Sequence, residues 1–455
     1  MLYKLKKATT VALLLILSVM LVSLPEIGVV NAESTIYIRA DGSVEPESTP
    51  ISSVDNVTYT FTDNIYDEIV VERNDIVVDG SGYTLQGQGI GNGFYLDSIK
   101  NVTIKRTLIK NFSNGIKLNS SSFNIVSENN ITDNWDGVVL SWSSNNTISG
   151  NDITNNGWGI YLRSSSNNTI ITNNIKKHLY AGERTPLGVQ LYRSSNNTIS
   201  GNNITNNHSG IHIDESSFNT ICGNNITNNP YRGLYLFKSL NNTIYQNNMT
   251  NNGYSIFIHS SAFNVVSENS ITDNEDGVVL YWSSTNNIVT GNTITNNSYG
   301  FASNGGIVSY ENGTRFYYLS SNNTISGNNV TNNHLGVKLY LSSNNIIYHN
   351  NFINNTQQIY DYSWDHPEFP PSINSWDDGY PSGGNSWSDY NGGDANGDGI
   401  GDTPYIIDEN NQDNYPLTEP AIIPEFPTWI FLPIFLMATL FTVIIKKRVY
   451  RSKIK

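Results

Sequence analysis

Residues Thr147–Asn156 read TISGNDITNN, and residues Thr198–Asn207 read TISGNNITNN. Outward from these two segments the same form recurs in eleven copies, most of them 22 or 23 residues apart, with two longer steps of 29 and 36 residues. A recurring period of this length indicates a repeat protein. The first apolar residues of the copies are Ile104, Val126, Ile148, Ile170, Ile199, Ile221, Ile244, Val266, Val289, Ile325 and Ile347.

Each copy contains three short apolar segments. In the copy that begins at Ile148, a second apolar residue follows at Ile153, and a glycine then precedes the triplet Ile160-Tyr161-Leu162. Alternating apolar residues bounded by Asn, Ser and Gly are typical of short β-strands. One unit cannot bury its apolar side chains alone, so the units must stack as parallel strands ~4.8 Å apart.

This pattern predicts an all-β fold, a right-handed parallel β-helix with three short strands in each 22–23-residue coil. We expect the repeats at residues 101–361, after an N-terminal cap and first coils at residues 33–100. A leucine-rich solenoid has units of similar length, but its leucine-dense consensus and helical segment are absent from this sequence.

An asparagine lies three residues after the first apolar residue in ten of the copies. We interpret these asparagines as structural, because stacked side-chain amides at a tight corner can hydrogen-bond along the rod as an asparagine ladder. The ten are Asn129, Asn151, Asn173, Asn202, Asn224, Asn247, Asn269, Asn292, Asn328 and Asn350.

Both ends of the chain resemble targeting segments. Residues 1–32 contain three lysines, an apolar stretch over 11–24 and the small-residue sequence Val30-Asn31-Ala32, which predict a cleaved signal peptide. In the C-terminal segment 421–455, Phe426–Ile445 is nearly all apolar and precedes a basic tail. This length predicts a transmembrane anchor with the basic tail inside. We therefore expect an exported protein anchored to the outer face of the cell membrane.

The charge of the chain excludes one class of partner. Nine of the 25 basic residues and one of the 39 acidic residues lie in residues 1–32 and 426–455, which leaves 16 basic against 38 acidic residues and a charge near −22 between these ends. Such a surface repels nucleic acid, favours cations and aids solubility outside the cell. Cys222 is the single cysteine, so no disulfide can form within the chain.

Several segments outside the repeat carry a family resemblance. Ile76–Leu85 reads IVVDGSGYTL, Trp376–Asn385 reads WDDGYPSGGN and Asp402–Tyr405 reads DTPY. With the stack of coils, they resemble the NosD family over residues 35–420, and in particular its archaeal surface branch. The family's β-helix is shared with carbohydrate-binding proteins and sugar hydrolases. Pro424–Pro427, PEFP, resembles an archaeal sorting tail, which implies processing by a sortase-like enzyme.

The resemblance also implies a copper function, because bacterial members of the family work with a transporter in maturing the copper centre of nitrous oxide reductase. The ligands for such a site are scarce in this sequence. No two of the seven histidines stand at ligand spacing, and His212 and His259 are two coils apart. We therefore do not expect copper. The histidines are His178, His208, His212, His259, His334, His349 and His366.

The third strand of each coil presents the most varied outward side chains. Exposed aromatic rings at regular spacing suit the apolar faces of sugars, and the neighbouring charged groups can form hydrogen bonds. The two longer steps place insertions around 177–187 and 301–316, which we expect just before this strand, where they would wall a groove. The predicted binding residues are Tyr161, Arg163, Tyr192, Arg193, Tyr235, Phe237, Lys238, Phe257 and His259. An exposed sheet that favours Tyr and Phe through strand propensity alone is the alternative.

His212, Asp214 and Glu215 in one coil are the candidates for acid–base catalysis. Paired carboxylates could cleave a glycosidic bond, and an acid–base pair beside a cation could eliminate or epimerise a uronic acid. Asp214 and Glu215 are sequential, so their side chains can diverge. No catalytic motif accompanies them.

The Asp/Gly/Trp-rich tail at residues 362–420 contains a candidate calcium loop. Asp394, Asn396, Asp398 and Asp402 stand at positions 1, 3, 5 and 9, and Gly399 stands at position 6 for the sharp turn. Position 12 is Tyr405 instead of the bidentate Glu, so the loop resembles short aspartate-rich calcium repeats more than an EF-hand. An ordinary polar turn is the alternative.

Together these patterns favour a surface protein that binds polysaccharide or another surface glycan without catalysis. The alternatives are a polysaccharide lyase, hydrolase or epimerase, a structural envelope spacer, and a copper-maturation factor. Sequons such as Asn130, Asn145, Asn203 and Asn225 are candidate N-glycosylation sites.

Overall fold

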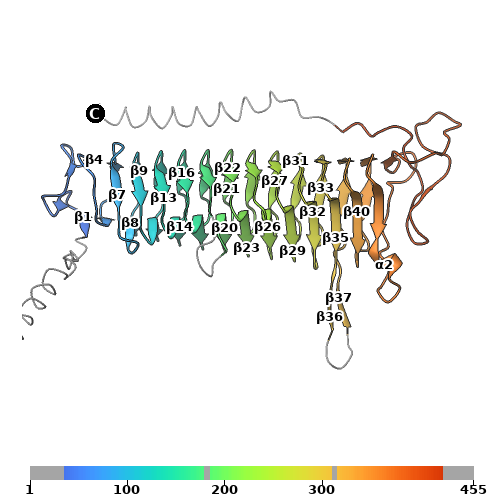
Figure 1. Ribbon diagram of the computed structural model, residues 1–455, viewed down its shortest axis with the longest axis horizontal. Helices are drawn as coiled ribbons and strands as arrows, with labels where there is room; N and C mark the ends of the chain where they lie inside the picture. Colours follow the sequence, from blue (N-terminus) through green and yellow to red (C-terminus); the bar gives the residue numbers. More distant parts are fainter. Residues whose placement is uncertain (1–34, 179–184, 310–314, 424–455) are drawn as a thin grey trace, which may run out of the picture.

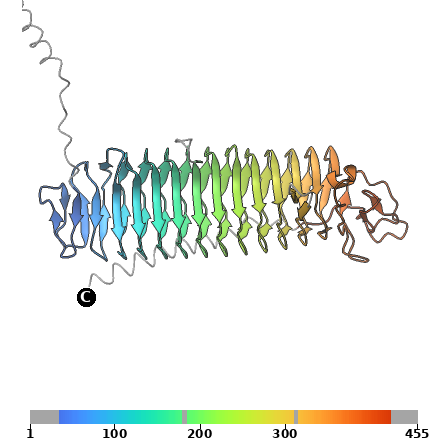
Figure 2. The same ribbon diagram turned by 90° about the horizontal axis from the view of Figure 1, so that it is seen from below.

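The computed structural model describes residues 35–178, 185–309 and 315–423. The chain winds as a right-handed parallel β-helix of about 13 turns, which confirms the predicted fold. The coils stack into a straight rod (Figure 1), and their strands lie side by side along its whole length (Figure 2). Three long sheets with 15, 14 and 13 strands follow the rod axis. We name them sheets A, B and C.

Each full coil contributes one strand to each sheet. In the coil that begins at Thr147, a sheet B strand and a sheet C strand of three residues each precede a sheet A strand of six. Sheet A contains β1 (Ile36–Ile38), β2 (Val44–Glu45), β5 (Ile69–Val71), β8 (Asn92–Asp97), β11 (Asn114–Asn119), β14 (Asp136–Ser141), β17 (Trp158–Arg163), β20 (Leu187–Tyr192), β23 (Ser209–Asp214), β26 (Arg232–Phe237), β29 (Tyr254–His259), β32 (Asp276–Tyr281), β35 (Tyr299–Asn304), β40 (Leu335–Tyr340) and β43 (Gln357–Asp361).

Sheets B and C form the other two sides of the rod. Sheet B contains β3 (Ile51–Ser52), β4 (Thr58–Phe61), β6 (Val77–Asp79), β9 (Thr103–Lys105), β12 (Ile125–Ser127), β15 (Thr147–Ser149), β18 (Thr169–Ile171), β21 (Thr198–Ser200), β24 (Thr220–Cys222), β27 (Thr243–Tyr245), β30 (Val265–Ser267), β33 (Ile288–Thr290), β38 (Thr324–Ser326) and β41 (Ile346–Tyr348). Sheet C contains β7 (Thr84–Gln86), β10 (Leu108–Lys110), β13 (Asn130–Thr132), β16 (Asp152–Thr154), β19 (Asn174–Lys176), β22 (Asn203–Thr205), β25 (Asn225–Thr227), β28 (Asn248–Thr250), β31 (Ser270–Thr272), β34 (Thr293–Thr295), β39 (Asn329–Thr331), β42 (Asn351–Ile353) and β44 (Ser386–Trp387).

The core is a set of aliphatic columns inside the rod. Ile148 and Ile153 are fully buried, and each pairs in register with an isoleucine of the next coil, Ile170 and Ile175. Burial of one such side chain contributes about 1.5–3 kcal/mol. Since every coil repeats these positions, the hydrophobic core runs continuously along the axis.

The predicted asparagine ladder is present at the corner between sheets B and C. The Asn151 side-chain nitrogen donates to the Oδ1 of Asn173 at 2.9 Å and to the Val126 carbonyl at 2.9 Å, and Asn151 Oδ1 accepts from the Asn129 amide at 3.0 Å. These asparagines are buried. Two further asparagine ladders, through Asn146 and Asn156, and a serine ladder through Ser143 satisfy the other corners and were not predicted.

The predicted position of the second insertion, just before the third strand of its coil, is wrong. This insertion forms the hairpin of β36 (Gly306–Ser309) and β37 (Arg315–Tyr318), and it follows the sheet A strand β35 instead of preceding it. The inward positions of β35 are Phe301 and Ser303, so the expected apolar pair is broken by a serine and the strand was not recognised. The first insertion does precede its sheet A strand, between β19 and β20.

The C-terminal tail closes the rod. Buried Trp376 and Trp387 cover the last coil, and β44 extends sheet C by pairing with β42. The tail also contains α2 (Tyr362–Asp365) and the antiparallel pair β45 (Tyr405–Ile406) and β46 (Gln412–Asp413).

The predicted signal peptide at residues 1–32, the sorting motif at 424–427 and the anchor at 426–445 lie outside the described residues. Within the described ranges, no helix has the length and apolar character needed to cross a membrane.

Candidate functional site

Sheet A presents three columns of side chains to the outside. In each central six-residue strand the third and fifth residues point into the core, whereas the first, fourth and sixth point outward, as the alternating burial of β26 shows. On β26 these outward residues are Arg232, Tyr235 and Phe237. The repeat pattern predicted that this strand begins after the glycine, which occupies the second position. The outward residue at the first position was therefore not predicted in any coil.

The middle of sheet A carries a cluster of contacting rings. Phe257 lies at centroid distances of 5.7 Å from Tyr235, 5.0 Å from Tyr254 and 5.4 Å from Tyr281. Phe257 is only 8% exposed, so it forms the floor of the cluster and is not one of the exposed rings that the sequence predicted. Val279 and Ala302 continue this floor with progressively smaller side chains. The result is an apolar surface edged by tyrosines.

Arg232 lies on this cluster. Its guanidinium carbon is 4.0 Å from the ring centroid of Tyr235, 4.3 Å from that of Tyr231 and 4.9 Å from that of Phe257. Its Nε is buried and has no hydrogen-bond partner in the described part of the chain. Aromatic faces attract such a cation, but they supply no acceptor for its N–H groups.

Two histidines flank Tyr235. The Tyr235 hydroxyl and His259 Nδ1 are 2.8 Å apart, and the ring of His212 lies 4.9 Å from that of Tyr235. Burial and the charge of Arg232 lower the pKa of His212 to about 3, and the same causes lower the pKa of His259. Burial raises the pKa of Tyr235 to about 12. All three side chains are therefore neutral near pH 7.

The three catalytic candidates do not converge. Asp214 accepts a hydrogen bond from Gln190 at 3.1 Å, and burial raises its pKa. Glu215 sits at the next corner with a φ of 47° and pairs with Arg193 at 2.7 Å. The sequential acids thus point to different partners. His212 Nε2 is buried without a partner among the described residues.

One acid on this face was missed. Asp276 occupies the first outward column on β32, is 9% exposed, and its Oδ1 has no hydrogen-bond partner within the described ranges. Burial raises its pKa to about 7, with a smaller contribution from the neighbouring Glu275. The sequence feature that could have identified Asp276 is its position directly before the glycine of the strand, which is the first outward position in each coil.

The remaining predicted binding residues lie on the same face, except that Arg193 and Lys238 occupy the corner directly after β20 and β26. Phe237 stacks on Tyr235 at 6.2 Å, and Lys238 lies 5.0 Å from the Phe237 ring. The other contacts are Tyr161 to Trp158 at 4.7 Å, Arg163 to Trp142 at 5.6 Å and Arg193 to Tyr192 at 4.9 Å. The nine residues extend from β17 to the end of β29.

A cavity of about 510 Å³ continues this face towards the C-terminal end of the rod. The β36–β37 hairpin stands beside it, because Tyr318 of the hairpin lies 5.5 Å from Trp282. Asn304 Oδ1 in this cavity is buried and lacks a partner in the described part of the chain. The lining residues are Tyr281, Trp282, Asn304, Gly305, Gly306, Lys338, Tyr340 and Tyr362.

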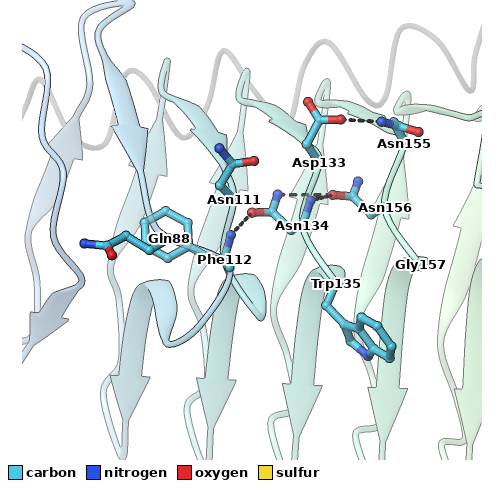
Figure 3. Close-up of a pocket in the computed structure, with 10 residues that line it drawn as sticks. Gln88, Asn111, Phe112, Asp133, Asn134, Trp135, Asn155, Asn156 and Gly157 are labelled. Carbon is cyan, nitrogen blue, oxygen red and sulfur yellow. Dashed lines mark hydrogen bonds between the residues drawn. The ribbon is translucent and has the colours of Figure 1, made fainter. Parts of the chain in front are cut away.

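A second cavity, of about 580 Å³, lies at the corner between sheets C and A in the N-terminal half of the rod (Figure 3). Its floor is the Asn134–Asn156 step of a buried ladder, and Trp135, 48% exposed, stands at one side. Asp133 accepts a hydrogen bond from Asn155 at the rim. This cavity has one large exposed ring, whereas sheet A has a row of half-buried rings.

The described residues do not fit a copper site. No group of three His, Cys, Asp or Glu side chains within the described ranges is placed to hold a metal ion. His178 replaces an asparagine in a corner ladder, where its Nδ1 accepts from the Asn156 amide at 3.1 Å. Met249 is a core residue.

The predicted calcium ligands lie in one turn. Both carboxylate oxygens of Asp394 accept backbone amides, from Gly397 at 2.7 Å and Gly399 at 2.9 Å. Asp402 accepts from the Ala395 amide at 2.8 Å, and Asp398 accepts from Asn396 at 2.9 Å. Oxygen ligands of this kind suit calcium. Calcium binding stays a prediction.

The fold is a solenoid of the parallel β-helix class, and its sheet A carries a row of aromatic and charged side chains on the outside. The chain belongs to the NosD family: the family described as "Periplasmic copper-binding protein (NosD)" matches residues 28–186, 74–260, 184–318 and 249–392, which together cover most of the chain. The periplasmic description supports export. The comparison with curated proteins finds no match.

Several solved structures are similar to this chain. The Dettilon tailspike protein is 16% identical with a TM-score of 0.43, over 66% of this chain and 63% of the tailspike chain. PfbA, a surface adhesin of Streptococcus pneumoniae, is 14% identical with a TM-score of 0.45, over 64% and 82%. A mutant of the periplasmic alginate epimerase AlgG is 15% identical with a TM-score of 0.39, over 72% and 82%.

Proposed function

We propose that the outward face of sheet A, from β17 to β40, binds a linear glycan that lies along the rod axis, and that it does so without catalysis. The observation that carries the proposal is the ring cluster around Phe257, which contacts Tyr254 of its own strand and Tyr235 and Tyr281 of the two neighbouring coils. Rings arranged in this way offer flat apolar surfaces to sugars. Successive coils are ~4.8 Å apart, so an extended chain meets a similar surface at every coil.

Unpartnered polar atoms along the same face support a polar ligand. Buried polar atoms in proteins are nearly always hydrogen-bonded, and those that are not require an explanation. Five outward side chains of sheet A between β20 and β35 have a buried atom without a partner among the described residues, each on a different strand. They are Gln190, His212, Arg232, Asp276 and Asn304. The hydroxyl groups of a glycan can supply both donors and acceptors to such a row.

A polysaccharide lyase, hydrolase or epimerase is the second candidate function. Asp276 favours it, because a buried carboxyl with a pKa of about 7 suits general acid–base chemistry. Among the described residues its buried oxygen has no hydrogen-bond partner that could exchange a proton with it, and His212, with a pKa of about 3, is a poor base. Binding therefore accounts for more of the face than catalysis does.

We also place this function outside the cell, in agreement with the family's periplasmic description. The proposed anchor is the apolar segment 426–445, and the proposed sorting motif is PEFP at 424–427, both outside the described residues.

A glycan array and a polysaccharide pull-down with the full-length chain test the proposal. The test variant carries Tyr192→Ala, Tyr235→Ala and Phe257→Ala. The control variant removes three exposed rings from another edge of the rod, Phe123, Phe218 and Phe263, which are 58%, 59% and 55% exposed. We expect the test variant to lose binding and the control to keep it. Absence of binding by the wild type would contradict the proposal and favour the structural spacer. Equal loss in both variants would contradict the assignment of binding to sheet A.

Binding then justifies an assay for reaction products. Cleavage, elimination or epimerisation of the bound glycan, abolished by Asp276→Asn, would move the assignment to the enzyme.

A further inference from the structure

Most basic side chains on the sheet A face rest on aromatic rings and not on acids. Lys338 Nζ lies 5.0 Å from the Tyr299 ring, and Arg232, Lys238 and Arg163 also lie over rings. For none of these four does any described carboxylate lie within ion-pair distance. Arg193, which pairs with Glu215, is the exception.

Several basic side chains on other parts of the rod pair with acids. Arg39 pairs with Glu45 and Glu72, Lys105 and Arg106 both pair with Asp79, and Lys176 pairs with Asp152 at 3.4 Å. The chain has 39 acidic residues, so acids are available to pair with most cations. None of the four sheet A cations forms such an ion pair with a described acid, although Arg232 and Lys338 interact electrostatically with Asp214 and Asp276.

Arg232 is the most informative of these cations. Its guanidinium is partly withdrawn from water among three rings, and its buried Nε lacks an acceptor in the described part of the chain. A charged donor removed from water without an acceptor is destabilising, and the ring contacts offset only part of this effect. A ligand carboxylate or sulfate group would complete the site, because a guanidinium binds such groups with two parallel hydrogen bonds.

The other titratable groups that face Arg232 do not neutralise it. His212, His259 and Tyr235 are neutral near pH 7, and the pKa of His208 is also lowered, by burial and by Arg232 itself. Asp214 interacts electrostatically with Arg232, but its carboxylate is hydrogen-bonded to Gln190 and burial raises its pKa. The positive charge of Arg232 is thus left for a ligand.

We propose that the glycan bound by this face is acidic, and that Arg232 binds the carboxylate or sulfate group of one of its sugar rings. This inference rests on the proposed function and adds the class of ligand. Lys338, four strands along sheet A from Arg232, binds a second acidic group roughly 19 Å away. The apolar floor of Phe257, Val279 and Ala302 lies between the two cations and receives the intervening sugar rings.

The net negative charge of the chain does not oppose this contact strongly. The Debye length is about 8 Å at physiological ionic strength, so acids elsewhere on the rod are screened from a ligand at Arg232. Close contacts on the face therefore decide which glycan binds.

The test compares glycans that differ only in charge. We would measure binding of the full-length chain to polygalacturonate and to its methyl-esterified form, which separates a carboxylate from its neutral ester on one backbone. Dextran sulfate and dextran form the second pair and test sulfate. Arg232→Gln keeps a long side chain over the rings and removes the charge. Arg232→Lys keeps the charge but removes the guanidinium group that can form two parallel hydrogen bonds. Lys110→Gln removes one positive charge from sheet C as the matched control.

We expect the wild type and the Lys110→Gln variant to bind at least one acidic form about tenfold more tightly than its neutral partner. Arg232→Gln should lose that preference, Arg232→Lys should retain part of it, and the thermal unfolding of all variants should match the wild type. Equal binding of acidic and neutral forms by the wild type would overturn the inference while leaving glycan binding intact. An unchanged preference in Arg232→Gln would also overturn it. Absence of binding to every glycan would overturn the proposed function itself.

Discussion

Asn224 offers a quantitative test of the asparagine ladder that holds the corner of the rod. Its Oδ1 accepts from the backbone amide and from the side-chain nitrogen of Asn202, both at 3.0 Å. Its own side-chain nitrogen donates to the carbonyl oxygens of Ile199 and Cys222 and to Asn247 Oδ1, at 2.9, 3.1 and 2.9 Å. Asn224→Ala removes all five hydrogen bonds from a site that is 1% exposed.

The cost follows from which groups stay unsatisfied. The Asn202 side chain keeps its bonds to the carbonyls of Ile170 and Ser200, and Asn247 Oδ1 still accepts the backbone amide of residue 224. The Asn202 amide loses its acceptor, which costs about 1–3 kcal/mol, and the missing side chain leaves a small cavity. We expect the free energy of unfolding to fall by about 3 kcal/mol in total.

Asn225→Ala is the matched control. Asn225 is the next residue and also bonds to amides in both neighbouring coils, at 2.8 Å to Asn203 and 2.8 Å from Asn248, but those partners are exposed to water. We expect a loss below about 0.5 kcal/mol. Urea unfolding followed by circular dichroism measures both, and hydrogen exchange of the Asn202 amide reports local opening, because a solenoid need not unfold in one step. Equal effects of the two substitutions would refute the ladder as a source of stability.

Three further predictions concern pH and calcium. Burial lowers the pKa of His178 to about 4, so the neutral side chain stabilises the fold above pH 6.5 and this contribution is lost as the pH falls towards 4. In urea titrations at pH 7.5 and pH 4, His178→Asn should reduce the difference in unfolding free energy between the two pH values by up to about 3 kcal/mol. An unchanged difference would contradict this prediction. Burial raises the pKa of Asp276 to about 7, so wild-type stability should decline as the pH rises from 4 to 7, and Asp276→Asn should abolish up to about 4 kcal/mol of that decline. Calcium at about 1 mM should slow proteolysis of the tail after chelator treatment, whereas an Asp394→Asn variant should not respond; equal proteolysis with and without calcium would refute the loop.

The repeat made most of the fold predictable. The 22-residue period, the Ile148 and Ile153 columns and the Asn151 corner each correspond to a single physical requirement, which is burial or hydrogen bonding in every coil. The other ladders were missed because an Asn-Asn pair does not reveal which amide turns inward: Asn156 is buried, whereas Asn155 is not. The β36–β37 hairpin was misplaced because Ser303 occupies a core position that is aliphatic in the neighbouring strands, as Leu280 and Leu339 show.

The candidate site was predicted in outline only. Alternation along the third strand placed Tyr235 and His259 on the outside, but it could not show that Tyr235 bonds to His259 or that neighbouring rings cover Phe257. Arg232 and Asp276 were missed because their strands begin one residue before the glycine. Contacts between residues of different coils depend on how neighbouring coils are aligned along the rod, and the sequence of one repeat does not give this alignment.

The most direct test of ligand binding on sheet A is a crystal structure of the protein with an oligosaccharide from the tightest-binding polysaccharide. We predict sugar rings along the rod axis from β23 to β40, stacked on Tyr235 and Tyr281, with an acidic group at the guanidinium of Arg232. A ligand confined to the Trp135 cavity, or bound only by the tail after residue 361, would contradict the assignment of the binding function to sheet A.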